Sequence, residues 1–180
     1  MLSENKKTFV KKMPKKITKQ RLKNIALFYL KRFESSENNL KTVLKRRIDK
    51  YAYFDKDFDK YEAYMWVDDL LCELVNLKYV DDERFAEIKI RAYLNAGKSP
   101  RYILGKLKEK GISEEIGETL LDEQDFDAFE SALKLAKKKK IGPFSCNDDL
   151  RRERRSKDLA VLIRAGFDYD VALQVLDFEE

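Results

Sequence analysis

Residues 81–121 read DDERFAEIKIRAYLNAGKSPRYILGKLKEKGISEEIGETLL and contain the start and stop signals of three consecutive helices. Asp81, Ser99 and Ser113 are residue types that cap helix N-termini, and a proline follows Ser99 at a first helical position. Glycines that suit the left-handed backbone after a helix lie at positions 97 and 111. The stretch therefore predicts a three-helix module.

The first helix of this module is expected from about Glu83 to Ala96. Apolar residues at helical spacing predict its buried face, namely Phe85, Ile88 and Ala92.

A second copy of the pattern follows 55 residues later, where residues 159–176 match residues 104–121 at corresponding positions without a gap. The match includes the glycine that ends a helix, Gly111 or Gly166, and the polar cap two residues after it. Two unrelated amphipathic helices would not also share both signals, so the chain contains an internal repeat.

The composition favours an all-α protein. The chain of 180 residues has only six glycines and three prolines, 39% of its residues are charged, and long stretches show the 3.6-residue helical period. No apolar run approaches the roughly 20 residues that a membrane span requires. The basic N-terminus lacks the apolar segment of a secretory signal, so we expect a cytoplasmic protein without a membrane partner.

Several kinds of catalytic and metal site are excluded by residue type. The chain has no histidine and two cysteines, which removes zinc sites, Ser-His-Asp triads and Cys-His pairs. Cys72 lies in an apolar run and is expected to be buried. The run of alternate aspartates at 55–59 lacks the turn glycine and the glutamate of a calcium loop. We therefore expect no enzyme activity, no metal and no cofactor.

Positive and negative charge alternate along the chain. Residues 1–50 hold sixteen Lys and Arg against four Asp and Glu, and residues 51–83 hold three against ten. The same alternation continues through residues 84–180. If modules stack in register, their basic helices form one positive stripe, which is typical of a nucleic-acid binder. The alternative is that the charged blocks only solvate helices and pair between modules.

Several motifs resemble those of the RecX family of RecA regulators. Residues 78–86, KYVDDERFA, are similar to that family's G-[YF]-[LIV]-D-D-x-R-F-A signature, with Lys78 where the family often has glycine. Residues 97–103, GKSPRYI, resemble its central repeat, and residues 164–171, RAGFDYDV, resemble its terminal motif.

The resemblance implies an all-α fold of three tandem three-helix repeats in an elongated, curved array. We expect a flexible basic arm at residues 1–20, then modules at 21–80, 81–125 and 126–180. The first module is degenerate, with an insertion or an extended helix junction near 51–61.

The resemblance also implies a function. Members of the family bind the RecA–DNA filament, block its extension or promote its disassembly, and so lower RecA ATPase, strand-exchange and coprotease activities. The expected partners are the RecA filament and single- and double-stranded DNA, with the protein itself a monomer. The alternative is a DNA- or RNA-binding helical repeat protein without a RecA partner.

Eight basic residues are the candidate contacts for RecA or DNA. Three of them, Arg84, Lys98 and Arg101, fall on motif positions of the family. The other five rest on charge alone, since arginine suits phosphate through its fork of donors; they are Arg91, Arg151, Arg152, Arg154 and Arg155.

Overall fold

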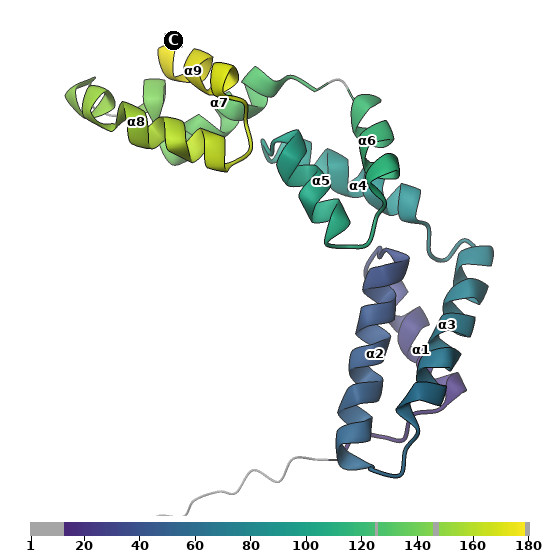
Figure 1. The fold of residues 1–180 in the computed structure, drawn as a ribbon. Coiled ribbons are helices and arrows are strands. Elements are labelled where there is room, and N and C mark those ends of the chain that lie inside the picture. Colours follow the sequence, from purple (N-terminus) through teal and green to yellow (C-terminus); the bar gives the residue numbers. More distant parts are fainter. Residues whose placement is uncertain (1–12, 125, 146–147, 179–180) are drawn as a thin grey trace, which may run out of the picture. The chain divides into compact units, whose positions relative to one another are not determined.

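A computed structural model describes residues 13–124, 126–145 and 148–178 of the chain, and the regular structure in these ranges is entirely helical (Figure 1). The all-α prediction is confirmed. The described chain forms two compact units. Unit 1 holds the described residues up to Glu34 together with Asn39–Val80, and unit 2 holds Ser35–Asn38 together with the described residues from Asp81 onward. The expected arm falls mostly on residues 1–12, which lie outside the described ranges.

Unit 1 is built on three helices, α1 (Lys19–Leu30), α2 (Glu37–Phe54) and α3 (Lys60–Asn76). The Thr18 side chain caps α1 by accepting a hydrogen bond from the Arg21 N–H at 3.2 Å. Leucines and an isoleucine with no exposed surface form the centre of the core, namely Leu22, Leu40, Leu44 and Ile48.

Residues 51–61 run from the last turn of α2 to the first turn of α3. The helix α2 continues to Phe54, and α3 begins at Lys60. The Asp59 carboxylate caps α3, because its Oδ1 accepts from the N–H groups of Tyr61 and Glu62 at 2.9 and 3.0 Å. The Asp55 carboxylate likewise accepts a local hydrogen bond, from the Tyr51 hydroxyl at 2.8 Å.

One part of unit 2 contains α4 (Asp82–Asn95), α5 (Pro100–Lys108) and α6 (Glu114–Asp122). All three predicted caps are confirmed, since Asp81, Ser99 and Ser113 each accept a backbone N–H from the first turn. The predicted buried face of α4 was wrong in part. Phe85 is buried, but its companions in the core are Ala86 and Ile90, whereas Ile88 is 45% exposed and Ala92 is exposed.

The rest of unit 2 contains α7 (Ala128–Lys139), a 3₁₀ turn η1 (Gly142–Phe144), α8 (Asp148–Arg164) and α9 (Tyr169–Asp177). Their core is separate from that of α4–α6 and includes Leu162, Phe167 and Leu176. The two cores repeat the predicted order, since each ends on a glycine turn and a closing helix with a polar residue, Ser113 or Asp168, at its N-cap position; only Ser113 makes the capping hydrogen bond. Three-helix repeats are therefore present; the exact module boundaries stay a prediction.

The expectation for Cys72 was wrong. Its neighbours Leu70, Leu71 and Leu74 are buried, and Cys72 lies on the exposed side of α3. A helix turns by about 100° per residue, so a position inside an apolar run still faces solvent when it lies off the buried stripe.

Unit 2 contains the same serine contact twice. The Ser99 hydroxyl, at the start of α5, donates to the carbonyl of Ala165 in the α8–α9 turn at 2.6 Å. The Ser36 hydroxyl donates to the carbonyl of Lys110 in the α5–α6 turn, also at 2.6 Å. Both serines are fully buried. Each turn therefore presents the carbonyl that precedes its glycine to a buried serine.

The glycines of these turns are required by space as well as by backbone angle. Gly111 has φ +81°, and a Cβ there would lie 2.4 Å from the Cβ of Asn38. Gly166 has φ +92°, and a Cβ there would lie 2.5 Å from the Ser99 hydroxyl oxygen.

Candidate functional site

The eight predicted contact residues lie on four segments of unit 2. Arg84 and Arg91 belong to α4, Lys98 to the turn after it and Arg101 to α5. The remaining four occupy the first half of α8: Arg151, Arg152, Arg154 and Arg155.

Arg84 and Arg91 lie on one face of α4. Seven residues correspond to nearly two helical turns, so the two side chains leave the helix in almost the same direction about 10 Å apart. The Arg91 side chain is 69% exposed and its guanidinium lies 3.6 Å from the Glu87 carboxylate. Ile88 lies between the two arginines and is 45% exposed. This face of α4 thus combines two cations with an exposed aliphatic side chain.

Lys98 belongs to an aromatic cluster that sequence reasoning missed. Its Nζ lies 4.8 Å from the centre of the Tyr102 ring, which is an attractive cation–π distance. Tyr102 also makes an edge contact with Tyr93, at 5.7 Å between ring centres. Lys106 lies 5.8 Å from the Tyr102 ring and donates to Glu109 at 2.8 Å. The four-residue spacing of Lys98, Tyr102 and Lys106 was the available signal for this cluster.

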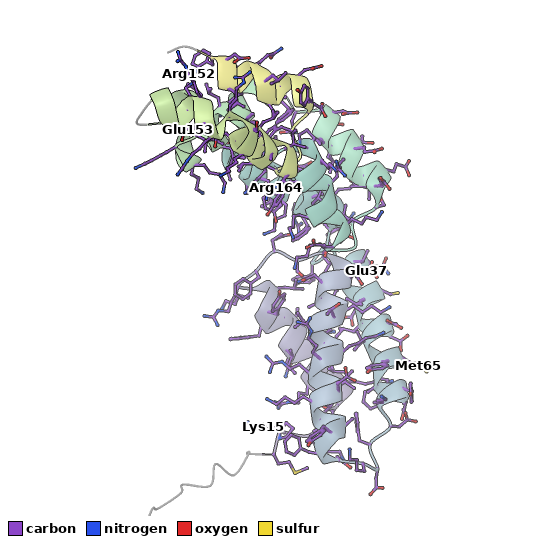
Figure 2. All side chains as sticks on the ribbon, turned by 60° about the vertical axis from the view of Figure 1, so that its left-hand side comes forward. Lys15, Glu37, Met65, Arg152, Glu153 and Arg164 are labelled. Carbon is purple, nitrogen blue, oxygen red and sulfur yellow. The ribbon has the colours of Figure 1, made fainter. Side chains whose placement is uncertain are left out.

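Arg101 lies against the α8–α9 turn. Its Cβ is 3.2 Å from the position that a Cβ on Gly166 would take. Arg101 therefore reaches the C-terminal end of α8, whereas the arginine cluster occupies the other end (Figure 2). Arg152 and Arg164 are twelve positions apart, which corresponds to about 18 Å of helix. Arg101 thus lies near the C-terminal end of α8, and the four arginines of α8 itself lie near its N-terminal end.

Two of the four α8 arginines bind α9. Nη2 of Arg151 donates to the carbonyls of Leu176 and Phe178 at 2.8 and 3.3 Å. Arg155 forms a two-pronged ion pair with Asp177, with distances of 2.5 and 3.0 Å. The hydrogen bond from Arg155 lowers the pKa of the Asp177 carboxyl, and the same bond raises the pKa of Arg155. These two arginines hold the end of α9 against α8.

Arg152 and Arg154 are exposed, and neither makes a hydrogen bond or ion pair with the part of the chain that the structure describes. Two residues correspond to about 200° around a helix, so their side chains leave α8 on opposite sides. Arg152 borders a pocket of about 370 Å³ with Arg151, Arg155 and two aspartates, Asp158 and Asp177. The four arginines of α8, which the sequence did not distinguish, thus form two pairs. Arg151 and Arg155 bind α9, whereas Arg152 and Arg154 are exposed.

The described ranges contain no cluster of three His, Cys, Asp or Glu side chains arranged to hold a metal ion. None of the helices in these ranges combines the length and the apolar character that crossing a membrane demands.

Comparisons with known proteins agree with the geometry. Residues 81–121 match the family model described as "RecX, second three-helix domain". The chain is 36% identical over 168 residues to "Regulatory protein RecX" of Myxococcus xanthus, which covers 92% of this chain and 89% of that protein. It is 30% identical over 145 residues to the protein of that name from Legionella pneumophila, covering 81% and 92% of the two chains.

A solved structure shows the same fold. The crystal structure of RecX from Lactobacillus salivarius superposes with a TM-score of 0.60 at 26% sequence identity, covering 88% of this chain and 96% of that chain.

Proposed function

This chain belongs to the RecX family of regulatory proteins, and from this membership we propose that it binds RecA–DNA filaments and inhibits RecA. In this proposal it lowers RecA ATPase, strand-exchange and coprotease activities by blocking filament extension or promoting disassembly. The action is one of binding rather than of catalysis, and its partners are the RecA filament and the DNA within it.

The observation that carries the proposal is the exposed face of α4. Ile88 lies there between Arg84 and Arg91. The phosphates of bare nucleic acid bind the two arginines, but they make no favourable apolar contact with the aliphatic side chain that lies between them. A protein-coated polyanion offers both acidic and apolar contacts, because the centre of a protein interface is apolar and its rim polar.

The eight predicted contacts divide into two groups in this proposal. Arg151 and Arg155 position α8 by holding α9. The other six are the proposed contacts with the filament, and they are Arg84, Arg91, Lys98, Arg101, Arg152 and Arg154.

The second candidate function is a nucleic-acid-binding repeat protein with no RecA partner. It is favoured by Arg152 and Arg154, whose guanidinium groups make no ion pair within the described chain. Free guanidinium groups on a helix bind phosphate without reading sequence.

The test is a titration of RecA ATPase on single-stranded DNA with this protein at two salt concentrations. We expect inhibition at a small fraction of the RecA concentration that persists at the higher salt. Inhibition that needs enough protein to cover the DNA, and disappears at the higher salt, would support the second function instead, because sequestering DNA depends on counterion release.

A further inference from the structure

Unit 1 contains a pocket of about 600 Å³ that the predicted contacts do not include. It lies between α1, the residues that precede α1, and the C-terminal half of α2, where Figure 2 shows Lys15. Its lining includes the basic side chains Lys15, Arg21, Arg47 and Lys50 and the aromatic side chain of Phe28.

The pocket has no acidic residue in its lining. Two basic residues of unit 1 that face α3 form ion pairs there: Lys23 with Glu73 at 2.5 Å and Lys41 with Asp68 at 2.7 Å. Asp49, the acid between the two basic residues of α2 that line the pocket, accepts a hydrogen bond from Tyr64 of α3.

The pocket-lining cations have no such partners. Within the described chain, none of Lys15, Arg21, Arg47 and Lys50 forms an ion pair. The Nε of Arg21 is buried and has no acceptor among the described residues. A buried donor without a partner is rare and costly, and Arg21 is itself one of the residues that line the pocket. The positive field of the pocket is therefore uncompensated and suits a polyanion.

An exposed aromatic ring completes the pocket. Phe28 is 64% exposed, and the guanidinium of Arg32 lies 5.5 Å from its ring centre. The α1 positions that line the pocket run from Thr18 to Phe28, which is about 15 Å of helix. That length exceeds a single phosphate group and accommodates consecutive units of a strand. Phosphate-binding cations beside an aromatic platform are the arrangement that binds single-stranded nucleic acid.

We propose that the α1–α2 pocket of unit 1 is a binding site for single-stranded nucleic acid. The phosphodiester backbone contacts Arg21, Arg47 and Lys50, and a base stacks on Phe28. The site rests on the proposed function and deepens it, since it gives the chain a direct contact with the DNA strand of a filament.

The chain's own N-terminal segment is the competing occupant, because the pocket lining begins at Pro14. Residues 1–12 contain four lysines and one glutamate. A basic segment is repelled by a pocket lined only by basic and neutral side chains, so charge complementarity favours an external polyanion.

The test measures binding of fluorescent oligo(dT) to the full chain over a range of salt, without RecA. The variants are Arg47→Glu with Lys50→Glu, the milder pair Arg47→Gln with Lys50→Gln, and Phe28→Ala. The control pair, Lys31→Glu with Lys56→Glu, makes the same change of charge at exposed positions of unit 1 outside the pocket lining. Circular dichroism establishes that each variant is folded.

We expect the Gln pair to lower the slope of log affinity against log salt by about 1.4, because each single-strand phosphate contact contributes about 0.7. The Glu pair is expected to weaken binding about tenfold or more, well beyond the control pair. Phe28→Ala is expected to weaken oligo(dT) binding about fivefold or more and to leave the salt slope and the binding of a base-free strand unchanged.

Equal losses in the pocket pair and the control pair would overturn the proposal. So would displacement of oligo(dT) by poly-glutamate of equal charge, which would make the pocket a general anion site. Failure here is separable from failure of the proposed function. A chain that inhibits RecA but binds oligo(dT) normally after the pocket changes refutes the pocket alone, whereas a chain that binds oligo(dT) through the pocket without inhibiting RecA refutes the RecA role alone.

Discussion

At the scale of single residues, Lys78 occupies a backbone conformation that suits glycine. It lies in the turn between α3 and α4 with φ +59°, in the left-handed region. A side chain with a Cβ pays about 1 kcal/mol or more there because the Cβ approaches the following carbonyl. At this position the sequence motif departs from the RecX pattern, which often has glycine. The backbone of Lys78 still adopts the left-handed conformation that suits glycine.

We therefore expect Lys78→Gly to raise the free energy of unfolding by about 1 kcal/mol. Lys134→Gly is the matched control, because Lys134 lies within α7, where glycine costs about 1 kcal/mol in helix propensity. Urea unfolding followed by circular dichroism measures both. If both variants lose stability equally, the turn conformation of Lys78 is not strained.

Ser99 and Ser113 both cap a helix, but only Ser99 makes a second hydrogen bond through its hydroxyl. Each hydroxyl accepts a backbone N–H at 3.2 Å at the start of its helix. Only Ser99 also donates to a carbonyl of the next repeat, and only Ser99 is buried.

Ser113→Ala is expected to cost about 1 kcal/mol, the usual loss for an N-cap. Ser99→Ala is expected to cost about 1–3 kcal/mol more, because it also leaves the partly buried Ala165 carbonyl without its donor. Thermal and urea unfolding measure the difference. Equal losses would mean that the serine contact between repeats contributes no stability.

At the scale of helices, the ion pair between Arg155 and Asp177 links α8 to the end of α9. The hydrogen bond from Arg155 lowers the pKa of Asp177 in the folded state. A lowered carboxyl pKa contributes stability above its unfolded value, near 4, and that stability disappears as pH falls through the lowered pKa.

Asp177→Asn is therefore expected to melt at a lower temperature than the parent at pH 7, and the difference is expected to vanish at the acid end of a pH 7 to pH 2 series. High salt is expected to reduce the difference, because both partners are substantially exposed. A difference that stays constant with pH would mean that the carboxylate charge has no part in holding α9.

The α8 arginines permit a comparison at constant charge. Arg151→Ser with Arg155→Ser is expected to lower the melting temperature, because it removes the hydrogen bonds to Leu176, Phe178 and Asp177. Arg152→Ser with Arg154→Ser is expected to leave the melting temperature unchanged and to weaken binding to the RecA–DNA filament. Thermal unfolding and filament co-sedimentation separate the two effects; a reversed pattern would contradict the division into positioning and contact residues.

At the scale of the whole molecule, the proposed role requires that the chain recognise a protein-coated strand. Two exposed isoleucines provide a matched pair, since Ile88 on α4 is 45% exposed and Ile163 on α8 is 41% exposed. Only Ile88 lies between two of the predicted contact arginines.

Ile88→Ser is expected to raise the protein concentration needed for half-inhibition of RecA ATPase by about tenfold, the usual effect of losing about 1–2 kcal/mol at an interface centre. Binding of bare DNA is expected to stay unchanged, and Ile163→Ser is expected to alter neither. Equal loss of bare-DNA binding in Ile88→Ser would favour the second, RecA-independent function.

Much of the fold follows from the sequence because its signals are local. A cap residue, a helix-ending glycine and a 3.6-residue apolar period each act within one or two helical turns. For this reason Asp81, Ser99 and Ser113 were placed correctly as caps, and the internal repeat identified the two glycine turns at Gly111 and Gly166.

The tertiary structure decided what each outward side chain contacts. Arg151 and Arg155 could not be separated from Arg152 and Arg154 by charge, because their partners on α9 lie more than twenty residues away in sequence. The exposure of Ile88 and Cys72 depends in the same way on which neighbour covers a helix. The pocket of unit 1 needs two helices brought together. Short stretches of sequence thus determine the helices, their caps and the repeats. Which charged side chains pair is decided by contacts between segments that are distant in sequence.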